Sequence, residues 1–367
     1  MSSGAPDRAR ELLAWEAPLG IVSIYLEIDP GNRGGGWRAE LGNGLERLRD
    51  FAADAEHDRK LALRATADRI AAHFEAGEPP FSPGEAGFIE ICERPGRELW
   101  LPFHLPPRAA EAVTLGPDPV LAPLLDLLCR SSRRAVALVS AERVRLLDWA
   151  PGELEQVEDW ELSLFSDGWR ERKAQRPADR AGVHGPGASG HDQFDQRLDA
   201  NRERFLVECG RLAAGRSRER GLADLFAFGP AADLRRFREG VGAEPPHFLV
   251  GSERDLISVP RADLRAPIAA AVEEVEQDRD RELARRVLDA ARGGGRGSAG
   301  ADETGVALGE GRVAHLLIDR GGLDGAPVDV EALVRRAVAT DAAVTLVSPA
   351  AAGALSGAGG VAALLRY

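Results

Sequence analysis

The sequence predicts an α/β protein with three domains, and three observations support this expectation. Short apolar strands alternate with amphipathic helices along the 367 residues. The order of these elements differs between residues 1–130, 131–260 and 261–367. The apolar share of 44% and the charged share of 29% are typical of globular domains. We therefore expect an α+β N-terminal domain, a mixed-sheet middle domain and a three-layer α/β/α C-terminal domain.

The elements of the N-terminal domain follow from side-chain periodicity. β-branched and aromatic residues predict strands, and apolar residues spaced by three and four predict helices. Pro95 and Gly96 separate two apolar runs and predict the turn of a hairpin. In chain order we expect a strand over 20–28, helices over 37–51 and 58–74, a hairpin over 87–103 and a short buried helix over 120–129.

The middle and C-terminal domains show the same two periodicities. Pro151 and Gly152 predict a turn before the third strand of the middle domain. The glycine-rich run GGGRGSAGA at 293–301 is interpreted as a flexible linker. The further expected elements are a helix from Phe194, a strand over 224–229, helices over 231–240 and 262–292, strands over 247–250, 313–318, 342–348 and 360–367, and helices over 328–340 and 350–355.

Charge and composition exclude several classes of protein. The net charge of −12 argues against a general nucleic-acid coat protein, because such proteins bind by neutralising phosphates. The chain has no apolar run long enough to span a membrane, and its acidic N-terminal segment does not resemble a secretory signal. Cys92, Cys129 and Cys209 fit no metal spacing and are expected to be reduced, buried thiols. A cytoplasmic protein without cofactor is expected.

The segment 169–205 carries the strongest functional signal. A basic run approaches a loop of glycine, proline and other small residues, and a strongly charged helix follows. The loop glycines permit backbone conformations that other residues avoid. The charges of the helix are expected to be mostly solvated. The basic run has a local surplus of positive charge suited to docking against phosphates, carried by Arg170, Arg172, Lys173, Arg176 and Arg180.

The loop ends in a Gly-x-x-Gln element formed by Gly190 and Gln193. Two interpretations remain open: a functional fingertip, or a glutamine that merely begins the helix. A metal site at His184, His191 and Asp192 is disfavoured, because their spacing has no set geometry and no fourth ligand is evident.

The run GASGHDQFDQRLDANRERFL resembles the catalytic loop and following helix of archaeo-eukaryotic peptide-chain release factors, and more closely their bacterial release-factor-like relatives. RVAHLLIDR, EALVRRAVAT, AAVTLVS and GGVAALLRY are similar to the last domain of release factors and Pelota. The resemblance covers about 133–367 and implies an RNase H-like middle domain. The N-terminal domain does not resemble the stop-codon-reading domain.

The resemblance implies an activity as well as a fold. In this family a Gly-Gly-Gln tip enters the peptidyl-transferase centre and hydrolyses the peptidyl-tRNA ester in ribosome rescue. Gln193 would position the water and Gly190 would shape the backbone, while the five basic residues would contact ribosomal RNA. The ribosome and peptidyl-tRNA are the expected partners, and no membrane partner is expected.

This chain departs from the family pattern, because His191 and Asp192 separate Gly190 from Gln193. Two alternatives to hydrolysis therefore stay open. The chain could be a catalytically inactive member that binds the ribosome, tRNA or a protein, or a scaffold with no ribosome contact.

Overall fold

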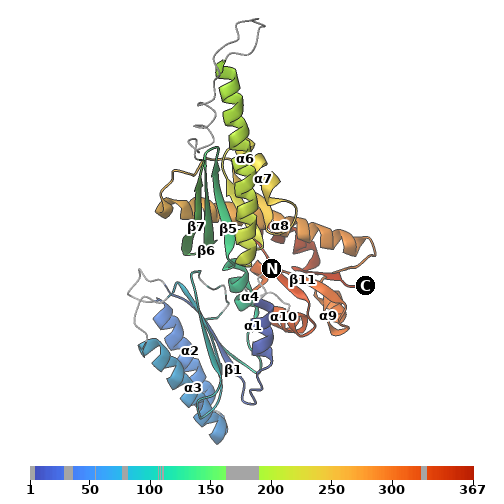
Figure 1. Ribbon diagram of the computed structural model, residues 1–367. Coiled ribbons are helices and arrows are strands. Elements are labelled where there is room, and N and C mark those ends of the chain that lie inside the picture. The colour runs from blue at the N-terminus through green and yellow to red at the C-terminus, as the bar shows by residue number, and fades with distance from the viewer. Residues whose placement is uncertain are drawn as a thin grey trace, which may run out of the picture. The chain divides into compact units, whose positions relative to one another are not determined.

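The computed structural model describes residues 5–28, 36–53, 55–76, 82–105, 107, 109, 111–162, 190–323 and 329–367. Figure 1 labels the helices and strands. The chain divides into two compact units, Met1–Ser132 with Glu273–Tyr367 and Arg133–Val272. Helices and mixed or antiparallel sheets occur in both units, which confirms the predicted α/β class. The predicted division into domains at 130 and 260 stays a prediction.

The N-terminal part of the first unit is a four-stranded antiparallel sheet in the order β3-β2-β1-β4. Val22, Ile24 and Leu26 of β1 pack in one core with α2 and α3, whereas Tyr25 enters a different core. The predicted strand, two helices and hairpin are confirmed; α1 and β4 were not predicted. The elements are α1 (Ala5–Leu13), β1 (Ile21–Glu27), α2 (Gly36–Ala53), α3 (His57–Ala76), β2 (Gly84–Glu90), β3 (Glu98–Phe103) and β4 (Val113–Gly116).

The C-terminal part of the first unit is a sheet in the order β10-β13-β11-β12, with β11 parallel to β12. Leu317 packs against α8 and α11 on one face, whereas Leu316 and Ile318 join the core of α9 and α10 on the other. The predicted three layers are therefore confirmed. The elements are α8 (Arg265–Arg292, continuous with the second unit), β10 (Gly297–Ala299), α9 (Ala301–Gly309), β11 (Val313–Asp319), α10 (Val330–Ala339), β12 (Ala343–Val347), α11 (Pro349–Leu355) and β13 (Val361–Leu365).

The prediction of a flexible linker at 293–301 is wrong. Strand β10 lies inside this run and pairs with β13, with Ser298 opposite Ala363. The Ser298 hydroxyl is buried and lies 3.0 Å from the Thr304 hydroxyl of α9. Tertiary pairing therefore overrides the flexible tendency of the glycines.

Helix α4 (Ala122–Arg130) connects the two sheets of the first unit. The Tyr25 hydroxyl donates to the Val120 carbonyl at 2.5 Å. The Glu331 carboxylate of α10 accepts the Leu121 and Ala122 backbone N–H groups at 2.8 and 2.9 Å. A carboxylate at a helix N-terminus satisfies N–H groups that have no partner within the helix.

A buried carboxylate strengthens the same connection. The Asp126 side chain is fully buried, and its two oxygens lie 2.7 Å from Arg130 Nε and 2.7 Å from Arg320 Nε. Arg320 also donates to the Leu346 carbonyl of β12 at 3.0 Å. Because each charge has a partner, the interior of this unit tolerates the ions.

The second unit is a five-stranded mixed sheet in the order β7-β6-β5-β8-β9. Strands β5, β6 and β7 are antiparallel neighbours, and β8 and β9 add in parallel to β5. This topology confirms the predicted RNase H-like sheet. The elements are β5 (Arg134–Ser140), β6 (Arg143–Ala150), β7 (Glu153–Glu161), α6 (Gly190–Glu219), β8 (Asp224–Phe228), α7 (Ala231–Val241) and β9 (His247–Ser252).

Helices α6 and α7 pack on one face of this sheet with their backbones in contact. A Cβ atom added to Gly210 would lie 2.1 Å from the Phe237 carbonyl oxygen. One added to Gly240 would lie 1.8 Å from the Val207 carbonyl oxygen. Only glycine permits this approach, so the two glycines set the position of α6.

Substitution of Gly210 tests this contact. Gly210→Ala should lower the free energy of unfolding by about 1–3 kcal/mol, the usual cost of overpacking. Gly215→Ala is the matched control in the same helix, because nothing lies within 4 Å of its added Cβ. It should be neutral or stabilise by up to about 1 kcal/mol, since alanine favours helices. Equal effects of the two substitutions in denaturant unfolding would contradict the close contact.

The buried Glu331 predicts a pH dependence of stability. Burial raises the pKa of Glu331 above its ordinary 4.5, and the Leu121 and Ala122 N–H groups offset part of this rise. Folding therefore favours the protonated form. As the pH rises from 4.5 through the raised pKa of Glu331, the free energy of unfolding of the wild type should fall relative to that of Glu331→Gln. Above that pKa, the difference between the two free energies should stay constant. Unfolding curves of both proteins across this range check it; a pH-independent difference would contradict it.

Candidate functional site at the end of helix α6

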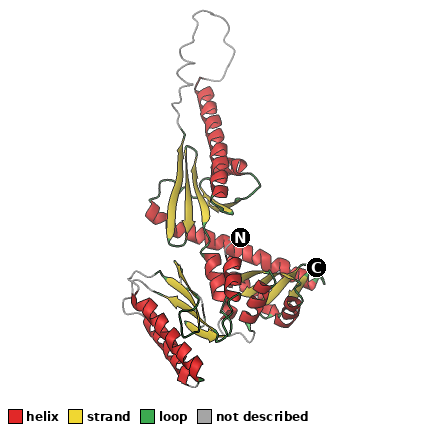
Figure 2. Cartoon of the chain, turned by 60° about the horizontal axis from the view of Figure 1, so that its bottom comes forward, coloured by secondary structure: helices red, strands yellow, loops and turns green. Residues whose placement is uncertain are grey.

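Helix α6 extends beyond the sheet on which it packs. Its 30 residues span roughly 45 Å. Leu206, Cys209, Ala213 and Ala214 are buried in the core of the second unit. The described side chains ahead of Leu206, from Gln196 to Phe205, are exposed or half-buried. Both views show the N-terminal end of α6 beyond the ends of β5, β6 and β7 (Figures 1 and 2).

The length of this projection follows from helix geometry. Gly190 begins α6 sixteen residues before Leu206, which corresponds to about 24 Å along the axis. No described side chain of this stretch is buried, although the half-buried Phe205 packs against the core, so its direction is set mainly by the packed half of the helix. The beginning of α6 is therefore the candidate functional site.

Gly190 and Gln193 lie in the first turn of α6, so the helix begins four residues earlier than predicted. Acidic residues favour the first turn of a helix, and Asp192 lies in that turn of the sequence. The side chain of Gln193 falls outside the described ones. The predicted RNA-binding residues also lie outside the described residues: Arg170, Arg172, Lys173, Arg176 and Arg180.

Ion pairs orient the projecting helix on the body of its domain. Arg202 of α6 pairs with Glu142 in the turn between β5 and β6. Arg216 Nε lies 2.9 Å from Glu158 of β7. Arg236 of α7 lies 2.7 Å from Glu203 of α6. Exposed pairs contribute at most about 1 kcal/mol each, so they fix orientation more than stability.

A stronger ionic contact lies at the C-terminal end of α6. The Asp148 carboxylate of β6 is buried, and its two oxygens accept from Arg133 at 3.0 Å and from Arg220 at 3.1 Å. Removing this carboxylate would leave two cations without their buried partner. Thus the packed end of α6 is held by core side chains, helix contact and charge together.

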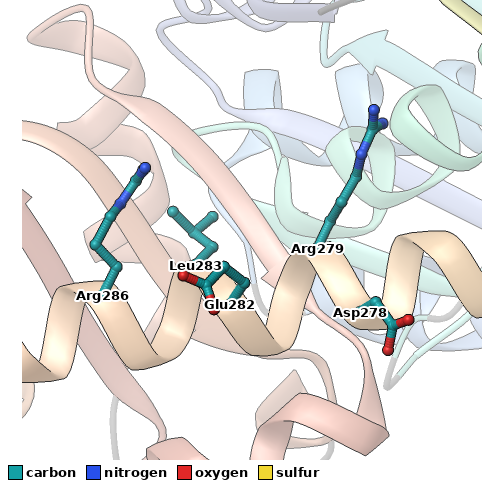
Figure 3. A pocket seen from close by; sticks show the side chains of 5 residues that line it. All are labelled: Asp278, Arg279, Glu282, Leu283 and Arg286. Carbon is teal, nitrogen blue, oxygen red and sulfur yellow. The ribbon is translucent and has the colours of Figure 1, made fainter. Parts of the chain in front are cut away.

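No enclosed active-site cavity accompanies α6 in the described part of the chain. A hollow of about 480 Å³ lies beside α8 and is lined by Asp278, Arg279, Glu282, Leu283 and Arg286. Figure 3 shows that Arg279 and Arg286 point to one side of α8 and Asp278 to the other. Polar groups that bind a small molecule converge, and these do not.

The side chains of the disfavoured metal site, His184, His191 and Asp192, fall outside the described ones. The described residues contain no group of His, Cys, Asp and Glu placed to hold a metal ion. His315 Nε2 lies 2.8 Å from the Thr345 hydroxyl, and burial lowers the pKa of His315. No helix among the described residues is long and apolar enough to cross a membrane.

The expectation that all three cysteines are buried is wrong. Cys209 is buried in α6, and burial raises the pKa of its thiol to about 12, so it is not a nucleophile. Cys129 is exposed near the end of α4, and Cys92 is half-buried. Leu125, four residues earlier on the same face of α4, is buried, so Cys129 is exposed because it lies in the last turn of the helix.

Residues 119–292 match Bacterial archaeo-eukaryotic release factor family 10. The matched range includes α4, the whole middle sheet, α6, α7 and α8, and it is just under half of the chain. "Uncharacterized protein YocB" of Bacillus subtilis (strain 168) is 22% identical over 158 residues, which are 42% of this chain. The match spans 59% of the length of that relative.

Solved structures of translation factors are similar over most of the chain. Archaeal translation termination factor aRF1 is 17% identical with a TM-score of 0.27, covering 100% of this chain and 99% of that one. Archaeoglobus fulgidus Pelota is 16% identical with a TM-score of 0.36, covering 77% and 79%. The archaeal Pelota in a model of ribosome-bound Pelota and ABCE1 is 14% identical with a TM-score of 0.43, covering 99% and 94%.

The match to residues 119–292 contains the projecting helix and the sheet that carries it. These residues are similar to Bacterial archaeo-eukaryotic release factor family 10.

Proposed function

We propose that the protein is a cytoplasmic peptidyl-tRNA hydrolase of ribosome rescue, with the beginning of α6 as the part that reaches the ester. The observation that carries this proposal is the projection of α6 from a domain matched to a release factor family. The substrate ester lies deep inside the ribosome. A narrow, rigid arm can reach such a site, whereas a cleft on a globular body cannot.

The chemistry needs positioning more than strong acids or bases. A water oxygen attacks the ester carbonyl carbon, the bond from that carbon to the tRNA oxygen breaks, and a proton passes to the departing tRNA oxygen. The products are a peptide with a free carboxyl group and a tRNA with a free hydroxyl group. Gln193 would hold the attacking water, and Gly190 would let the backbone approach the substrate.

The position of these residues at a helix N-terminus supports the same role. The first backbone N–H groups of a helix have no acceptor within it, and the helix dipole places partial positive charge at that end. Both features favour the negative charge that develops on the carbonyl oxygen during attack. The basic residues Arg170, Arg172, Lys173, Arg176 and Arg180, which precede α6 in the sequence, would contact ribosomal RNA phosphates.

A second candidate is an inactive family member that binds the ribosome, tRNA or a protein partner. The helical backbone of Gln193 favours it, because a residue within a helix has less freedom than one in a loop. His191 and Asp192 also separate Gln193 from Gly190. This candidate predicts ribosome binding without peptide release.

Peptide release from purified, stalled ribosome complexes separates the two candidates. Gln193→Ala should reduce the release rate about 100-fold with unchanged ribosome binding, because a misplaced water forfeits most of the positioning effect. Gln196→Ala is the matched control, since Gln196 is exposed one turn further along α6. It should release peptide at the wild-type rate.

Equal release by the wild type and Gln193→Ala would remove Gln193 from the mechanism. Absence of release by the wild type, together with sedimentation on ribosomes, would favour the inactive binding protein. Absence of both would contradict the proposed site of action.

A further inference from the structure

Four arginines recur at seven-residue intervals along α6: Arg197, Arg204, Arg211 and Arg218. Seven residues make nearly two helical turns, so each arginine lies about 20° from the previous one around the axis. The axial step is about 10.5 Å, and the four positions together span roughly 31 Å. They form a single ridge along the helix, which we call the arginine ladder.

The arginine ladder lies opposite the packed side of α6. Leu206 and Ala213 are buried, and each follows an arginine of the ladder by two residues. Two residues rotate a helix by about 200°, so the ladder faces away from the core. All four arginines are exposed.

Ion pairing separates the ladder from the other arginines of α6. Arg202 and Arg216 pair with Glu142 and Glu158 of the sheet, as described above. Arg197, Arg204 and Arg218 form no ion pair with any residue that the structure describes. Arg211 donates to Glu208 at 3.0 Å, an exposed pair that another anion can replace.

We infer that the arginine ladder binds the phosphate backbone of RNA. This inference rests on the proposed function, which brings α6 into the ribosome, and it names the surface that lies against ribosomal RNA there. Guanidinium groups form paired hydrogen bonds to phosphates and lose little hydration on doing so. A straight row of cations over roughly 31 Å fits an extended polyanion better than a single anionic group.

Because the whole chain is acidic, RNA binding requires a local group of unneutralised cations. A protein of net charge −12 is repelled by RNA at long range. Attraction must therefore come from a place where cations are not neutralised by neighbouring carboxylates. Arg197, Arg204 and Arg218 of the ladder meet this condition among the described residues, and the ladder begins one turn after Gln193 on the projecting end of α6.

The test compares two triple variants with the same loss of charge. The first, Arg197→Gln with Arg204→Gln and Arg218→Gln, removes three arginines of the ladder. The control, Arg281→Gln with Arg285→Gln and Arg292→Gln, removes three exposed arginines of α8, each paired with a nearby acid. Circular dichroism and the melting temperature show whether each variant is folded.

Binding is measured to a fluorescein-labelled RNA duplex and to purified large ribosomal subunits between about 50 and 200 mM salt. Each lost phosphate contact lowers the slope of log affinity against log salt by about 1. The ladder variant should lose about 3 from this slope on both probes, and the α8 variant should retain the wild-type slope. If the triple ladder variant does not fold, Arg204→Gln alone should lower the slope by about 1.

An unchanged slope in the folded ladder variants, or equal losses in the ladder and α8 variants, would overturn the inference. These outcomes are independent of peptide release, because the binding assays contain no peptidyl-tRNA. A negative result for Gln193 in the peptide-release assay would therefore not contradict RNA binding by the ladder. A negative result for the ladder in the binding assay would likewise not contradict the role of Gln193.

Discussion

The backbone contact between α6 and α7 is the constraint on which the position of the projecting end of α6 depends. Gly210 and Gly240 allow each helix to touch the carbonyl oxygens of the other, and any side chain there would separate them. A projecting helix amplifies small errors at its base: a tilt at Gly210 moves Gly190, twenty residues away, by several ångströms. The packed half of α6 thus determines where its free end lies.

Charge is organised around the same helix. Arg202 and Arg216 of α6 pair with Glu142 and Glu158 of the sheet, and Arg236 of α7 pairs with Glu203 of α6. Three arginines of the ladder, Arg197, Arg204 and Arg218, are exposed and form no ion pair with a residue that the structure describes. An acidic protein can in this way keep one cationic ridge without becoming a general nucleic-acid binder. The first unit uses carboxylates differently: Asp126 and Glu331 are buried and connect its two sheets through α4.

Much of this architecture could be predicted from the sequence, because strands such as β1 and helices such as α2 have strong periodic patterns. Strand β10 could not be predicted, because it has only three residues and lies within a glycine-rich run. Its strand structure depends on pairing with β13, which is distant in the sequence. The close contact at Gly210 and Gly240 could not be predicted from the sequence, because glycine has a low helix propensity and its presence indicates only a weaker helix. The seven-residue spacing is visible in the sequence, but the contrast between paired Arg202 and unpaired Arg204 depends on which of them faces Glu142.

We propose that α6 is a rigid arm whose first turn acts at the peptidyl-tRNA ester. Electron cryo-microscopy of the protein on a stalled ribosome carrying peptidyl-tRNA tests this claim most directly. We expect density for the first turn of α6, with Gly190 and Gln193, against the ester. We also expect density for the arginine ladder beside ribosomal RNA phosphates. A bound protein whose α6 begins in solvent, away from the peptidyl-transferase centre, would contradict it.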